Sequence, residues 1–194
     1  MTNYSIYRIS ETIRVLLFIT VTIIAFQVYP VTALMIVLLA ILNDLPVITI
    51  AYDNVKFSNF PESWNMRQVL EIATFLGTIG VFSSFGMFLI GRDILHLSPL
   101  ILQSFMYLKL SVAGHTVLLA ARTKGHFWTV RPANILILAI ISTQLTATLL
   151  TVYGILLPAM GWGLAAIVWG YTLALFLVTD FLKVAFYNRL ERRG

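Results

Sequence analysis

The sequence predicts an all-α integral membrane protein, a bundle of six transmembrane helices with both termini cytoplasmic. Hydrophobic residues make up 59% of the 194 residues and charged residues only 11%, whereas a soluble domain carries about 25% charged residues. A bilayer core about 30 Å thick requires about 20 helical residues, so the chain has room for six spans with short connections. Because the sequence contains no cysteine, disulfides and thiolate chemistry are excluded.

Six apolar segments, separated by polar or proline-containing connections, define the expected helices. Pro30 ends the first and begins the second, because proline suits the first turn of a helix and not its interior. In the third segment, Ala73, Gly77 and Gly80 permit close contact with a neighbouring helix. The single transmembrane domain, residues 1–194, therefore has helices at about 5–28, 31–50, 67–90, 99–121, 133–157 and 164–186, with cytoplasmic loops at 52–66 and 122–132.

Basic residues indicate the orientation. On the opposite side of the membrane only Arg92 is expected, in a short loop with Asp93 and His96. Cytoplasmic loops carry an excess of Lys and Arg, which places both termini in the cytoplasm, in agreement with an even number of spans. The residues that this assignment places on the cytoplasmic side are Arg8, Lys56, Arg67, Arg122, Lys124, Arg131, Arg189, Arg192 and Arg193.

A polar break, Asn43-Asp44-Leu45-Pro46, interrupts the second apolar segment. Lipid cannot solvate a carboxylate, and a proline inside a helix leaves a backbone carbonyl without its donor. Transporters build ion sites from such carbonyls where a helix is broken beside a buried carboxylate. The pattern therefore favours an ion-binding site, although a purely structural proline kink gives the same pattern.

Arg14 is the expected counter-ion of Asp44. Arg14 lies fifteen residues before Tyr29 and Asp44 fourteen residues after Pro30, so both lie roughly 20 Å inward from the same turn. Pairing with Arg14 would favour the ionised carboxylate, whereas separation in a dry site would favour the neutral acid. Such a pair is either a switchable proton site or a static contact between two helices.

Other charges lie within the predicted spans. Lys109, about 15 Å from the outer face, is a candidate counter-ion for Asp44, a substitute for a bound cation, or a side chain that reaches a water-filled crevice. His115 is expected to be a hydrogen-bonded packing residue. The fifth span carries a polar stripe that is expected to satisfy neighbouring helices. The charges nearer the cytoplasmic face, which can reach the interface, are Glu11, Glu71, Asp180 and Lys183.

The chain also resembles a known family. The segments NYSIYRISETIRVLLF, ILND, DNVKFSNFPESW, FWTVRP, GWG and FLVTDFLKVAF occur in order over nearly the whole chain. They are similar to the C-terminal membrane half of plasma-membrane proton-pumping P-type ATPases, in which they correspond to transmembrane helices five to ten. The resemblance implies that Asp44 is the proton acceptor and donor, that Arg14 promotes proton release, and that Asn43 is the adjacent asparagine.

The chain differs from this family at Leu45-Pro46, where a glycine is expected after the aspartate, and at Lys109, where a neutral residue is expected. The sequence contains neither the phosphorylation motif DKTG nor the TGE motif. The resemblance therefore implies that the chain binds no cofactor and cannot hydrolyse ATP alone. ATP and Mg would act in the complete translocase.

The predicted function is accordingly the proton-translocating membrane portion, a fragment or subunit, of an ATP-driven cation pump in the plasma membrane. Its implied partners are protons or small cations, the bilayer, the first four helices, and the nucleotide-binding, phosphorylation and actuator domains, with no nucleic acid. The alternative is a stand-alone, non-enzymatic membrane protein derived from such a pump, either a scaffold or a passive cation pathway.

Overall fold

The structure, a computed structural model, describes residues 2–54 and 66–191. Within these ranges it contains six α-helices and no strand, which confirms the all-α prediction. The helices are α1 (Thr2–Phe26), α2 (Ala33–Thr49), α3 (Met66–Leu89), α4 (Pro99–Ala121), α5 (Asn134–Tyr153) and α6 (Gly161–Glu191), with a 3₁₀ turn, η1 (Ile50–Tyr52), after α2 and a π-helical turn, η2 (Ile90–Ile94), after α3.

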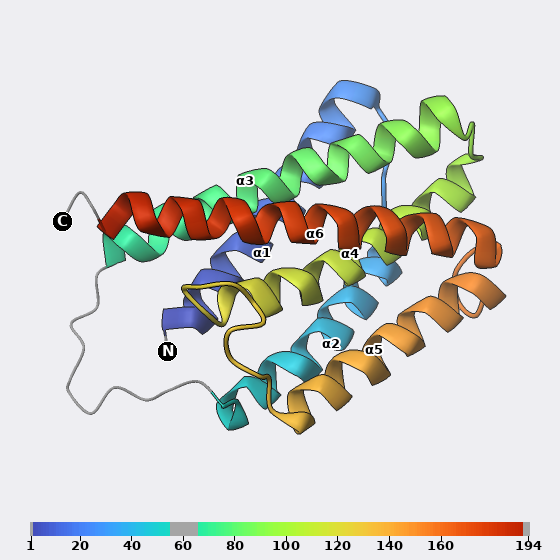
Figure 1. Ribbon diagram of the computed structural model, residues 1–194. Coiled ribbons are helices and arrows are strands. Elements are labelled where there is room, and N and C mark those ends of the chain that lie inside the picture. The colour runs from blue at the N-terminus through green and yellow to red at the C-terminus, as the bar shows by residue number, and fades with distance from the viewer. Residues whose placement is uncertain (1, 55–65, 192–194) are drawn as a thin grey trace.

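The helices surround α4, which lies in the middle of the bundle (Figure 1). Buried residues occur on all sides of α4, and it packs against each of the other five helices. α1 packs chiefly on α3 and also on α4, whereas α2 packs on α4 and α5. Successive helices run in alternating directions, so the start of α1 and the end of α6 lie at the same end of the bundle (Figure 1).

The helix lengths fit a multi-pass membrane protein. Among the described residues, five helices are long and apolar enough to cross a membrane, and α2 is shorter, with 17 residues. That length is at the lower limit of the range of about 17–25 residues that spans a bilayer. The cytoplasmic position of the termini stays a prediction. Residues 55–65, most of the expected loop at 52–66, and residues 192–194 lie outside the described part of the chain.

Local backbone chemistry moves several helix ends from their expected places. α2 begins at Ala33 because the Thr32 hydroxyl accepts a hydrogen bond from the backbone N–H of Met35. α5 ends at Tyr153, before the expected end at residue 157, because Gly154 adopts a left-handed conformation with φ of 74°. The expected loop at Arg92-Asp93 belongs instead to η2, which extends α3.

The predicted close contact of the small residues of α3 with a neighbouring helix is found, and that helix is α1. A Cβ added to Gly77 would lie 2.8 Å from Ile13 Cγ2, and one added to Gly80 would lie 2.7 Å from Arg14 Cδ. The Ser10 hydroxyl also donates a hydrogen bond to the Ala73 carbonyl at 3.0 Å. Because Gly77 and Gly80 have no side chain, α1 can approach α3 closely, and there is room for the Arg14 side chain.

Replacing Gly77 by Ala is expected to destabilise the protein, because the added methyl overpacks the contact with α1, at a cost of about 1–3 kcal/mol. The matched control is Gly170→Ala in α6, where an added Cβ meets nothing within 4 Å. That change should be neutral or stabilising by up to about 1 kcal/mol, because alanine favours helix. Thermal unfolding of the detergent-solubilised chain measures both. Equal stability of the two variants would contradict the described contact.

Candidate functional site

A buried ion pair lies within α1. Arg14 is 1% exposed, and its Nη2 donates to the two carboxylate oxygens of Glu11 at 2.5 and 2.6 Å. The two residues are three apart, so they share one face of the helix. The same nitrogen donates to the Leu110 carbonyl of α4 at 3.0 Å, so this one guanidinium joins α1 to α4.

Asn43 connects α2 to this pair. Its side-chain Nδ2 donates to Glu11 Oε1 at 3.3 Å. Room for the amide exists because residue 114 of α4 is glycine, where a Cβ would lie 2.9 Å from Asn43 Nδ2. Asn43 Oδ1 is buried and has no hydrogen-bond partner among the described residues. We refer to Glu11, Arg14 and Asn43 as the polar centre, and it is formed where α1, α2 and α4 meet.

Asp44 lies outside the polar centre, so its expected pairing with Arg14 is wrong for this structure. Asp44 Oδ1 accepts from Arg8 Nη2 at 2.6 Å, and the side chains of Arg8 and Asp44 are 39% and 46% exposed. Successive residues of a helix are about 100° apart around its axis, so Asn43 enters the centre while Asp44 points elsewhere. The Asp44 side chain is therefore only half-buried. The residue that pairs with Arg14 is Glu11, and the sequence analysis did not predict this pair.

Pro46 is buried in α2, but it does not break the helix. α2 continues through Pro46 to Thr49 and then tightens into η1. Because proline has no N–H, it cannot donate the usual helical hydrogen bond to the carbonyl of Leu42. Its own carbonyl accepts from the Thr49 hydroxyl at 2.7 Å. The predicted break of the helix at Pro46 is therefore wrong, because α2 is continuous and lacks only one backbone hydrogen bond there.

Lys109 is not a counter-ion of Asp44. It is fully buried in α4, and its Nζ donates to Ser84 Oγ of α3 at 2.5 Å. Ser84 in turn donates to the Gly80 carbonyl at 2.8 Å, so its oxygen is free to accept from the lysine. The ammonium therefore lies on the α3 side of α4.

The predicted contacts of the polar stripe of α5 with neighbouring helices are confirmed in part. Thr143, Gln144 and Thr148 bond to other helices, whereas Thr146 and Thr151 bond to carbonyls of α5 itself. His115 Nε2 lies 3.1 Å from the Thr143 hydroxyl, and its Nδ1 lies 2.9 Å from the Ser111 carbonyl. Gln144 Nε2 also reaches the Ser111 hydroxyl at 3.1 Å. His115 is therefore a hydrogen-bonded packing residue between α4 and α5.

Two further buried ion pairs hold the ends of helices. Lys183 and Asp180 of α6 pair at 2.8 Å, and both side chains are buried within the protein. Asp180 also accepts from the Phe127 backbone N–H at 3.2 Å, which attaches the loop after α4 to α6. Arg122, expected in a surface loop, donates to Asp53 at 2.5 and 2.8 Å. These pairs fix loops and lie apart from the polar centre.

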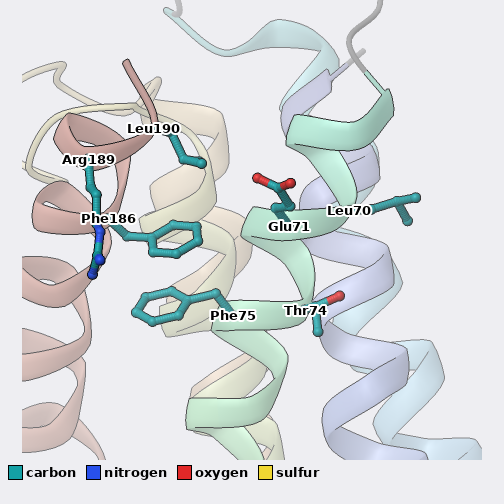
Figure 2. A pocket seen from close by; sticks show the side chains of 7 residues that line it. All are labelled: Leu70, Glu71, Thr74, Phe75, Phe186, Arg189 and Leu190. Atoms are coloured by element: carbon teal, nitrogen blue, oxygen red, sulfur yellow. The ribbon is translucent and has the colours of Figure 1, made fainter. Parts of the chain in front are cut away.

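A groove of about 630 Å³ opens between α3 and α6. Figure 2 shows the rings of Phe75 and Phe186 parallel within it, with centroids 4.2 Å apart. Glu71, which also lines the groove, pairs with Arg67 at 3.0 Å. The groove shares no lining residue with the polar centre, so we do not assign the site to it. Its lining residues are Leu70, Glu71, Thr74, Phe75, Phe186, Arg189 and Leu190.

These features define a multi-pass helical membrane protein with ionisable side chains in its interior. No known family profile matches the chain. Over 192 residues, 98% of its length, the chain is 43% identical to a protein of Methanocaldococcus jannaschii named "Putative cation-transporting ATPase". The match covers 24% of that protein, so the chain spans about a quarter of the length of this curated relative. Similarity to a cation-transporting ATPase is thus found, whereas the relative's name specifies neither a proton nor the plasma membrane.

Replacing Glu11 by Gln is expected to destabilise the chain strongly, because it leaves the buried Arg14 charge without its counter-ion. Breaking a buried pair costs about 3–5 kcal/mol. The matched isosteric control is Asp44→Asn, which breaks the half-exposed pair with Arg8 and should cost about 1 kcal/mol or less. Chemical or thermal unfolding in detergent gives both values. A larger loss for Asp44→Asn than for Glu11→Gln would contradict this description of the site.

Proposed function

We propose that this chain is the ion-carrying membrane part of a P-type cation pump and that the transported ion is a proton. The observation that supports this most is the polar centre, a buried carboxylate and guanidinium where three helices meet. Ionised groups inside a membrane protein are costly and commonly mark ion pathways. The similarity to a protein named as a cation-transporting ATPase supports the same class of function.

The chemistry of the polar centre favours a proton over a metal cation. Dehydrated metal ions need several oxygen ligands, six to eight for Ca²⁺. The polar centre contains one carboxylate, which Arg14 already occupies. No group of three acidic, histidine or cysteine residues that could hold a metal occurs in the described ranges. A proton needs only one carboxylate, and Asp44, next to the centre in α2, can provide it.

We assign Asp44 as the proton carrier, with Arg14, Asn43 and Pro46 as the residues that control it. Asp44 is half-exposed at the surface of the bundle and adjoins Asn43 of the polar centre. Protonation would remove its charge and release Arg8. The hydrogen bond missing at Pro46 would allow the end of α2 to move relative to α1. In this scheme Arg14 stays paired with Glu11, and its fixed position holds Asn43, through Glu11, beside the proton carrier.

The driving reaction would belong to the rest of the pump. ATP hydrolysis with Mg would take place in the nucleotide-binding, phosphorylation and actuator domains, and the first four helices would complete the ion path. This chain would then couple to those parts in the plasma membrane. Its own residues would hold and release the proton.

Replacing Asp44 by Asn in the complete pump should abolish ATP-driven proton transport, because an amide cannot take up and release the proton. The control is Asp93→Asn, which alters an exposed aspartate paired with Arg92 in η2 and should leave transport unchanged. Acidification of proteoliposomes on addition of ATP measures both. Undiminished pumping by the Asp44→Asn variant would overturn the assignment. A proton leak through this chain alone, without ATP, would support a passive pathway instead.

A further inference from the structure

A small cavity lies between α1, α3, α4 and α6. Its volume is about 30 Å³, and the residues that line it include Arg14, Gly80, Lys109 and Thr172. A cavity needs about 10–15 Å³ to hold one water molecule. This one therefore has room for one or two water-sized particles and none for a nucleotide or a lipid headgroup.

The wall of this cavity is positively charged. It contains two basic side chains, Arg14 and Lys109, and no acidic residue is among the described residues that line it. Glu11 neutralises Arg14 from outside the cavity. Lys109 has no acidic partner within 4 Å in the described chain, and its hydrogen bond goes to the neutral Ser84. The protonated form of Lys109 thus has no ion-pair partner among the described residues.

Unused hydrogen-bond donors accompany this charge. A lysine ammonium has three N–H donors, and one is directed to Ser84. Arg14 Nε and Nη1 are buried and have no partner among the described residues. The hydroxyl of Thr172, a residue only 3% exposed, has none either. Native proteins rarely leave so many buried donors unsatisfied, and each such group indicates a missing partner.

We propose that this cavity binds a small inorganic anion of the halide class, which in a cell is chloride. The anion accepts hydrogen bonds from the Lys109 ammonium and the Thr172 hydroxyl and lies beside the Arg14 guanidinium. A water molecule satisfies some of the donors, whereas an anion also balances the protonated form of Lys109, whose burial as an unpaired charge is costly. This site does not depend on the proposed transport of protons, because it needs only the described bundle.

Chloride binding to the purified full chain in solution tests the proposed site. Thermal unfolding is measured in detergent while potassium chloride replaces potassium gluconate at constant ionic strength. The midpoint temperature of unfolding should rise with chloride concentration, because chloride binds specifically to the folded state, and each further increment of chloride should have a smaller effect as the site fills. Replacing Lys109 by Met should weaken the chloride affinity by about tenfold or more, since hydrogen bonds to charged groups are the strong ones. An equal rise in gluconate, or an unchanged response of the Lys109 variant, would overturn the proposal.

A second pair of variants keeps the test valid where Lys109→Met fails to fold. Thr172→Val removes one hydroxyl from the cavity and should weaken chloride binding. Thr22→Val is the matched control, because Thr22 is fully buried elsewhere and its hydroxyl already donates to the Phe18 carbonyl. Equal chloride responses of these two variants would contradict the site.

Bromide locates the anion directly. In crystals of the full chain grown with bromide, anomalous scattering should give a peak in the cavity within hydrogen-bond distance of Lys109 Nζ and Thr172 Oγ1. A cavity that contains only water, or bromide bound only at the protein surface, would overturn the proposal.

Discussion

The ion pair between Glu11 and Arg14 sets the main constraint on this bundle. Removing a carboxylate and a guanidinium from water costs several kcal/mol for each ion, and their attraction offsets this only where further hydrogen bonds complete the site. The carbonyl of Leu110 and the amide of Asn43 provide those bonds from α4 and α2. Gly80 of α3 leaves space for the arginine side chain. Four helices are thus positioned by one pair of charges.

Arg14 also separates two regions with different chemistry. On one side lie Glu11 and Asn43, which with Arg14 form the polar centre, and to this centre we attribute control of a proton on Asp44. On the other side Lys109 and Thr172 line a small positive cavity, to which we attribute an anion. A fixed guanidinium between them suits both roles, because arginine stays charged at every physiological pH.

Hydropathy was sufficient to predict the helices, since a segment that crosses lipid must be predominantly apolar and must satisfy its own backbone hydrogen bonds. It was insufficient for the site. Counting residues along a helix gives the depth of a side chain but not the face on which it lies, so Asp44 was matched to Arg14 although only Asn43 faces the centre. Helices adjacent in sequence were also assumed to pack together, whereas α1 packs chiefly on α3. The three-residue spacing of Glu11 and Arg14 was the available signal for the correct pair.

The central claim is that Arg14 is coupled to Glu11 and not to Asp44. Two double-mutant cycles of unfolding free energy test it most directly, one combining Arg14→Met with Glu11→Gln and the other combining Arg14→Met with Asp44→Asn. Groups in contact show coupling of about 0.5–3 kcal/mol, whereas distant groups are additive within about 0.5 kcal/mol. We expect strong coupling in the first cycle and additivity in the second. Additivity for Glu11 with strong coupling for Asp44 would contradict the described site.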